Sequence, residues 1–179
     1  GNATITLPAG SENIVTSTTD YNSGIRAGGN NTTLTINGTG KLTVKGATRG
    51  AGIGSNRRGT CGNIVIEDGE IITSTGDYGA GIGSGYHATC GNITIKGGTI
   101  TATGGSCGAG IGSSFDNAIC GDILISGGTI TANGGIKAAG IGTGSAQQGL
   151  PSTCGNITIT DGVTSVTATK GNIVALHNS

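Results

Sequence analysis

The sequence predicts an all-β protein, a single-stranded parallel β-helix or solenoid of about five coils. Three observations support this fold class. The motif A-G-I-G recurs in steps of 29, 29 and 30 residues, at 51–54, 80–83, 109–112 and 139–142. The pair C-G recurs at 61–62, 90–91, 120–121 and 154–155. The 39 glycines, spread through every repeat, disfavour helix by about 1 kcal/mol each.

Each repeat supplies two short strands and one tight A-G-I-G segment. In the repeat that follows Cys90, the strand-like runs are Ile93-Thr94-Ile95 and Thr99-Ile100-Thr101, which alternate with the period of two that is typical of strands. Identical segments of successive coils should stack as parallel strands about 4.8 Å apart. Parallel crossovers are mostly right-handed, so we expect a right-handed coil of roughly 29–30 residues.

The same alternation predicts the core, because the two Ile of each G-N-I-T-I run point to one side of the strand. Stacked coils then form four inward columns, and each fully buried Ile stabilises the fold by about 1.5–3 kcal/mol. The columns are Leu34/Ile64/Ile93/Ile123/Ile157, Ile36/Ile66/Ile95/Ile125/Ile159, Leu42/Ile71/Ile100/Ile130 and Ile25/Ile53/Ile82/Ile111/Ile141. In the last repeat the run "GVTSVTAT" is longer than "GTITAT", which predicts a local bulge with Val166 pointing inward.

The repeats indicate one domain over residues 1–179, without a linker. Residues 1–22 are expected to form an irregular first partial coil, 23–170 the repeat coils, and 171–179 a final strand.

The composition excludes several classes of partner. Charged residues make up only 10% of the chain, with nine basic and nine acidic side chains. A nucleic-acid partner would call for a basic surface, so none is expected. No apolar run approaches the roughly 18 residues of a membrane span, so no membrane insertion is expected. A surface of Thr, Ser, Asn and Gly is typical of secreted or surface-exposed β-proteins, which predicts an extracellular or cell-surface location.

The stretches between A-G-I-G and C-G hold nearly all the length variation, with 6, 6, 7 and 11 residues. They should stack along one edge of the rod, where variable loops on a rigid scaffold tend to carry function. Aromatic rings there could pack on sugar faces, and planar polar groups could bind hydroxyls. The candidate carbohydrate-binding residues are Arg57, Arg58, Tyr86, His87, Phe115, Asp116, Asn117, Gln147 and Gln148. The alternative is that the rings only cap a corner and the polar groups are solvated.

Catalytic and metal sites have little support, so we expect a non-enzymatic protein without a cofactor. Glu67, Asp68 and Glu70 cluster at one turn, but neighbouring coils carry no acid at the matching positions. A glycosidase needs paired carboxylates at a defined separation, so a solvated turn is the favoured interpretation and a polysaccharide lyase-like enzyme is not. A Ca²⁺ site at a turn remains an alternative, although no calcium-loop motif supports it.

Four of the five cysteines, Cys61, Cys90, Cys120 and Cys154, occupy one column. The favoured interpretation is a stack of small, partly buried side chains. Disulfides between neighbouring coils, 61–90 and 120–154, are the alternative, because the strand spacing lies within the disulfide range. A zinc site is disfavoured, since a row of sulfurs does not converge tetrahedrally. Cys107 stands in a different column.

Two further functions are alternatives. Outward T-x-T rows at Thr99/Thr101 and Thr129/Thr131 resemble those of ice-binding proteins, but Lys41, Glu70 and Ile72 interrupt them.

A β-helix also has open strand edges at its two ends, which must be capped or paired. End-to-end docking of neighbouring copies would build a structural filament.

The repeat "GAGIGS…CGNITIKGGTITATGG" resembles glycine-rich β-helix repeats of surface proteins from anaerobic Gram-positive bacteria, many of them gut-dwelling. The front part, "NTTLTINGTGKLTVKG", is similar to carbohydrate-binding β-helix domains of clostridial surface proteins. This resemblance implies an extracellular, non-enzymatic role in adhesion, carbohydrate binding or structure, with bound Ca²⁺ in some members. A polysaccharide or glycan is therefore the expected partner.

Overall fold

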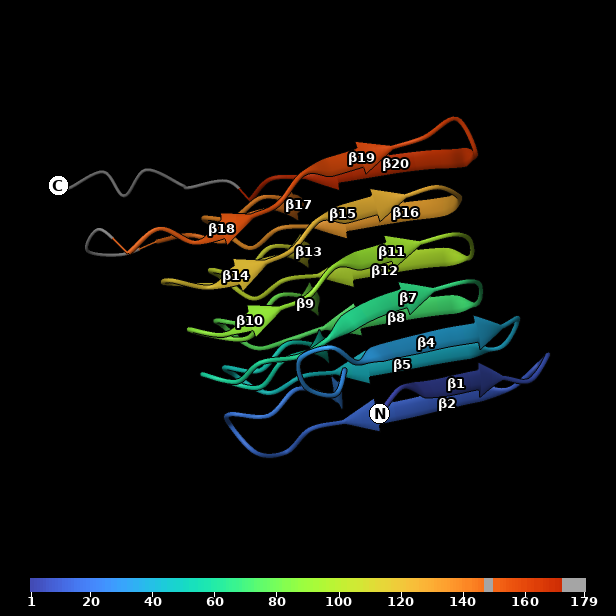
Figure 1. The fold of residues 1–179 in the computed structure, drawn as a ribbon, viewed down its shortest axis with the longest axis horizontal. Helices are drawn as coiled ribbons and strands as arrows, with labels where there is room; N and C mark the ends of the chain where they lie inside the picture. The colour runs from blue at the N-terminus through green and yellow to red at the C-terminus, as the bar shows by residue number, and fades with distance from the viewer. Residues whose placement is uncertain (147–149, 172–179) are drawn as a thin grey trace, which may run out of the picture.

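A computed structural model of the chain describes residues 1–146 and 150–171. The described residues are all-β, and their parallel sheets stack as a solenoid of about five turns (Figure 1), which confirms the predicted fold class. The hand of the coil stays a prediction. The described part of the chain includes no helix with the length and apolar character of a membrane span.

Two six-stranded parallel sheets form the long part of every coil. Sheet A consists of β1 (Ala3–Leu7), β4 (Thr33–Gly38), β7 (Asn63–Ile66), β11 (Ile93–Ile95), β15 (Ile123–Ile125) and β19 (Ile157–Ile159). Sheet B consists of β2 (Glu12–Thr16), β5 (Lys41–Lys45), β8 (Glu70–Ser74), β12 (Thr99–Thr103), β16 (Gly128–Asn133) and β20 (Val163–Thr169). Figure 1 shows the strand pairs stacked in chain order, from β1 and β2 to β19 and β20.

The A-G-I-G segments with the related S-G-I-R, and the residue pairs that end in the repeated Cys, form two smaller parallel sheets. Sheet C consists of β3 (Ile25–Arg26), β6 (Ile53–Gly54), β9 (Ile82–Gly83), β13 (Ile111–Gly112) and β17 (Ile141–Gly142). Sheet D consists of β10 (Thr89–Cys90), β14 (Ile119–Cys120) and β18 (Thr153–Cys154). In three coils, sheet D adds a short strand that the sequence did not predict to the two strands and the tight segment that it did.

The strand register reproduces the four predicted core columns. Ile95, for example, pairs with Ile66 on one side and with Ile125 on the other. Ile95 and Ile66 have no exposed surface. At the last coil the columns become accessible, because Ile157 is 45% exposed and Ile159 is 52% exposed. The core therefore runs along the solenoid axis and opens toward β19.

The predicted bulge in the last coil is also confirmed. Gly128 pairs with Val163, whereas the next residue, Thr129, pairs with Ser165. This shift by one residue restores the inward alternation, so that Val166 lies beside Ile130 and packs against the core.

Residues 1–22, expected to be irregular, carry two full strands, β1 and β2, in register with the next coil. In β2 the inward position opposite Leu42 is Asn13, whose Nδ2 donates hydrogen bonds to the carbonyl oxygen of Lys41 and the hydroxyl of Ser11, both at 3.0 Å. A polar side chain therefore covers part of the core at this end. Of the predicted final strand, all but Gly171 lies outside the described residues.

Candidate functional site

The variable loops stack along one edge, as the sequence predicts. Arg58, His87 and Asp116 lie one coil apart and share a left-handed backbone, with φ of 52°, 51° and 49°. Their N–H groups donate to the carbonyl oxygens of Tyr86, Phe115 and Ser145, respectively, at 2.8, 3.3 and 3.3 Å. Each loop is therefore held by the loop of the next coil.

A second column of side chains runs beside these loops, and the sequence analysis missed it. Its members stand two residues before each A-G-I-G, or before the related S-G-I-R: Tyr21, Arg49, Tyr78, Cys107 and Lys137. Backbone hydrogen bonds tie the two columns together, because Arg57 donates to the Tyr21 carbonyl at 2.8 Å and Tyr86 donates to the Arg49 carbonyl at 2.9 Å. This constant offset was the signal that could have identified the column.

All four Tyr and Phe residues of the chain gather where the two columns meet. The ring centroid of Tyr78 lies 5.6 Å from that of Tyr86 and 5.4 Å from that of Phe115. The rings of Tyr86 and Phe115 are stacked, 5.7 Å apart with an interplanar angle of 18°. The His87 ring lies edge-on to Tyr86 at 4.2 Å.

Two arginines link this group of rings to Tyr21. The guanidinium of Arg57 lies 4.8 Å from the Tyr21 ring and 5.7 Å from the Tyr86 ring. Arg49 lies 5.7 Å from both Tyr21 and Tyr78. Such distances fall within the range of cation–π attraction. The resulting cluster is called the aromatic edge below and comprises Tyr21, Arg49, Arg57, Tyr78, Tyr86 and Phe115.

Exposure separates the members that a ligand could reach from those that support them. Tyr21 is 47% exposed, whereas Phe115 is only 8% exposed and lies beneath Tyr78 and Tyr86. Asp116 is also 8% exposed, while Arg58 and Asn117 are exposed. The role of the predicted residues in binding stays a prediction, and Gln147 and Gln148 lie outside the described residues.

A hollow of about 260 Å³ lies at one end of the aromatic edge. It is lined by Tyr78, Cys107, Phe115, Lys137, Ser145 and Ala146. Two buried polar atoms in this region, Ser145 Oγ and Arg57 Nε, have no hydrogen-bond partner among the described residues. Buried polar groups are nearly always hydrogen-bonded, so both atoms have bonding capacity for water or a ligand.

The positive charges of the aromatic edge, and of Lys137 in the adjacent hollow, are not neutralised by an ion pair within the described residues. Arg49, Arg57 and Lys137 form no ion pair with a described carboxylate, because the two ion pairs found are Lys41–Glu70 and Lys96–Glu67. These two pairs involve two of the three clustered acids. The third acid, Asp68, accepts a hydrogen bond from the N–H of Gly69 at 2.8 Å.

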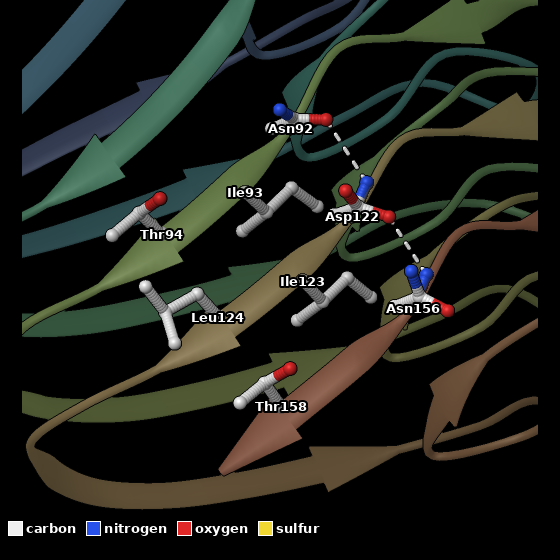
Figure 2. Close-up of a pocket in the computed structure, with 8 residues that line it drawn as sticks. All are labelled: Asn92, Ile93, Thr94, Asp122, Ile123, Leu124, Asn156 and Thr158. Carbon is white, nitrogen blue, oxygen red and sulfur yellow. Dashed lines mark hydrogen bonds between the residues drawn. The ribbon is translucent and has the colours of Figure 1, made fainter. Parts of the chain in front are cut away.

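A second hollow, of about 340 Å³, lies on the outer face of sheet A (Figure 2). Its polar side chains are committed to the backbone of the next coil: Asn92 Oδ1 accepts from the Asp122 N–H at 2.9 Å, and Asp122 Oδ1 accepts from the Asn156 N–H at 2.7 Å. These hydrogen bonds hold the coils in register. Thr94, Leu124 and Thr158 form a second row in this shallow groove (Figure 2), and the lining residues include no aromatic ring and no Lys or Arg.

The described residues contain no group of three or more His, Cys, Asp and Glu side chains that could hold a metal ion. The five cysteines are free thiols in the structure.

The predicted T-x-T rows lie on sheet B, where Thr101 has Ile72 on one side and Thr131 on the other. The row that continues through Thr99 reaches Glu70, so both rows are interrupted as the sequence indicates.

Comparisons with known proteins bear on the fold. No curated protein and no solved structure was found to match the chain. A family model described as a beta helix repeat matches four segments, residues 34–57, 64–86, 93–115 and 123–145, which together cover more than half of the chain. Each segment begins at a sheet A strand and ends in a variable loop of the candidate site. The chain therefore belongs to the beta helix repeat family.

Proposed function

We propose that this protein is a non-catalytic β-solenoid module of the extracellular space or cell surface that binds carbohydrate through its aromatic edge. The observation that carries the proposal is the gathering of every Tyr and Phe ring of the chain, with Arg49 and Arg57, on the edge formed by the variable loops. Rings bind the apolar faces of sugars, and guanidinium groups donate to their hydroxyl oxygens.

The spacing of the aromatic edge supports an extended ligand. Successive coils lie about 4.8 Å apart, which is close to the length of one pyranose unit in an extended polysaccharide. A glycan chain running along the edge would meet Tyr21 in the first coil and the hollow beside Tyr78 and Lys137 further along. Ser145, whose buried Oγ has no hydrogen-bond partner among the described residues, lines this hollow.

Charge favours acidic over neutral glycans at this edge. Arg49, Arg57 and Lys137 have no ion pair with a described carboxylate, and a uronic acid would supply one. Guanidinium–carboxylate hydrogen bonds are about twice as strong as neutral ones. We therefore expect polysaccharides that contain uronic acids to bind more tightly than neutral polysaccharides of similar length.

Affinity electrophoresis through gels that contain neutral, acidic or mucin polysaccharides tests this function. The variants are Tyr21→Ser, which removes the most exposed ring, and Lys137→Met, which changes the lining of the hollow. Leu124→Ser, on the outer face of sheet A, is the matched control, because Leu124 is also exposed but lies away from the edge. Retardation of the wild type that Tyr21→Ser loses and Leu124→Ser keeps is the expected result. Equal retardation of Tyr21→Ser and Leu124→Ser would overturn the proposal.

A structural filament is the second candidate, and the open end at β19 favours it. Ile157 and Ile159 continue the core columns but are about half exposed. Head-to-tail docking would place Ile159 against Ile5 of the next copy, since both belong to the same column. Asn13 weakens this contact, because its polar side chain would meet Val166. Light scattering over a concentration series, with Ile159→Lys as the blocking variant, distinguishes a growing filament from a constant monomer.

A further inference from the structure

Four thiols form a continuous column along the solenoid, called the thiol column below: Cys61, Cys90, Cys120 and Cys154. Strand pairing places Cys90 opposite Cys120 and Cys120 opposite Cys154. A bridge between Thr60 and Thr89 places Cys61 beside Cys90 in the same register. Neighbouring Cα atoms in this arrangement are about 4.8 Å apart, which lies within the range that a disulfide requires.

The cysteines of the thiol column are close neighbours, and the first two are in direct sulfur contact. The Sγ atoms of Cys61 and Cys90 lie 3.1 Å apart. Cys90 and Cys120, and Cys120 and Cys154, are direct partners in the strand register. Each inner cysteine therefore has one neighbour of the column on either side. Such a row suits thiol–disulfide exchange, in which the attacking and leaving sulfurs lie on opposite sides of the sulfur that is attacked.

Access to the thiol column is unequal. Cys61, Cys90 and Cys120 are each 2% exposed, whereas Cys154 in the last coil is half-buried. A reagent in solution therefore reaches Cys154 first. Hydrogen bonding between Cys154 and Cys120 raises the pKa of Cys154 and lowers the pKa of Cys120. Cys154 is therefore the accessible thiol of the column, and Cys120 is the neighbour that more readily attacks as a thiolate once Cys154 carries the reagent.

We propose that the thiol column is a disulfide-exchange relay, in which a low-molecular-weight disulfide oxidises the protein at Cys154 and the protein disulfide then moves inward from coil to coil. The Cys154 thiol loses its proton as its sulfur attacks the reagent disulfide; a mixed disulfide forms, and the released reagent thiolate takes up a proton to leave as one reagent thiol. Cys120 attacks the Cys154 sulfur and releases the second reagent thiol. The product is the Cys120–Cys154 disulfide, and two protein thiols have been oxidised while one reagent disulfide has been reduced.

The disulfide can then move without further oxidant. Cys90 attacks the Cys120 sulfur and Cys154 leaves as a thiolate; Cys61 next attacks the Cys90 sulfur and Cys120 leaves. The disulfide now joins Cys61 and Cys90, and the outer pair is reduced again. A second reagent disulfide oxidises Cys154 and Cys120 by the first two steps. The final state has two inter-coil disulfides, formed at the expense of two reagent disulfides.

This relay would lock the coils by covalent bonds and does not depend on carbohydrate binding. The cross-links join the coils at the side where sheet D has only three short strands. Because Cys107 lies outside the column, beside Tyr78 in the hollow, it takes no part and serves as an internal reference thiol.

A time course with oxidised glutathione tests the relay. Reduced protein is treated with the reagent, quenched with acid, alkylated and digested with trypsin, which separates residues 59–96, 97–137 and 138–170. The expected first product links 97–137 to 138–170. A link between 59–96 and 97–137 follows transiently, and a disulfide within 59–96 appears last. Cys107, which is also half-buried, enters no protein disulfide, and any glutathione adduct on it measures direct access of the reagent.

The Cys154→Ser variant separates a relay from independent oxidation of each pair. We expect it to form the Cys61–Cys90 disulfide several-fold more slowly than wild type, while the matched Cys107→Ser variant oxidises at the wild-type rate. Circular dichroism of the reduced variants checks that both are folded. Equal rates in Cys154→Ser and wild type would overturn the relay. So would a stable glutathione adduct on Cys154 as the end product.

Discussion

The guanidinium of Arg57 lies 4.8 Å from the ring centroid of Tyr21, and the Arg57 N–H donates to the Tyr21 carbonyl oxygen. The two residues belong to successive coils, so the coil register sets their contact. The side chain of Asn56 strengthens this junction, because its Oδ1 accepts hydrogen bonds from both the N–H and the hydroxyl of Ser23 at 2.9 Å. The loop of one coil is thereby fixed to the coil before it, and Arg57 is held between Tyr21 and Tyr86.

Replacing Arg57 should destabilise the protein through loss of its ring contacts. A partly desolvated cation–π interaction contributes about 1 kcal/mol, so Arg57→Met should lower the free energy of unfolding by about that amount. Arg58→Met is the control, because Arg58 is exposed and the same charge is removed one residue away. Urea denaturation measures both. An equal loss in the two variants would show that net charge, and not the ring contacts, is responsible.

Gly83→Ala should be among the more damaging substitutions of a single methyl group. Gly83 has φ of 136°, a region that L-residues rarely adopt, and a Cβ there would collide with the carbonyl oxygen of Gly112 in the next coil. Backbone strain of this kind costs about 1–3 kcal/mol, and displacement of the neighbouring coil adds to it. Gly29→Ala is the control, since a Cβ at Gly29 meets nothing within 4 Å. Thermal unfolding should show a clear drop in Tm for Gly83→Ala only.

Ile95 and Ile159 belong to one core column but should respond differently to truncation. Ile95 is fully buried, so Ile95→Ala leaves a cavity and should cost about 2–5 kcal/mol. Ile159 is 52% exposed at the open end, so Ile159→Ala should cost well under half as much in dilute protein. Guanidinium denaturation at low protein concentration compares the two. Similar losses would mean that the end is covered in solution.

The repeated part of the fold could be predicted from the sequence because each column uses the same residue type at the same offset. Ile64, Ile93 and Ile123 are recognisable as one column from their spacing alone, and the strand pairing confirms it. The displacement at Val166 was predictable for the same reason, because the last repeat is longer than the others. Periodicity identifies positions that every coil must fill in the same way.

The candidate site was predicted only in part, because its chemistry changes from coil to coil. The column Tyr21, Arg49, Tyr78 has one offset but unlike members, so no repeated letter marks it. Phe115 and Tyr86 were both expected on the edge formed by the variable loops, but the burial of Phe115 beside Tyr78 depends on how two columns pack. The sequence shows which residues share a column. It does not show which columns touch.

Lys41 provides a test of electrostatics on sheet B. The hydrogen bond and charge of Glu70, at 2.9 Å, raise the pKa of Lys41, and Glu12 on the other side adds a smaller effect. A raised pKa in the folded state favours folding at any pH below the ordinary lysine value, about 10.4, and this gain disappears as the pH rises through the raised pKa.

Glu70→Gln should therefore lower the pKa of Lys41, and Glu12→Gln should lower it by a smaller amount, because Glu70 contributes both the hydrogen bond and the larger charge effect. NMR titration of the Lys41 Nζ resonance in the three proteins measures both shifts. The stability advantage of the wild type over Glu70→Gln should also disappear as the pH rises through the raised pKa of Lys41. A pKa of Lys41 that is identical in wild type and Glu70→Gln would mean that solvent screens this pair completely, as it does for many surface ion pairs.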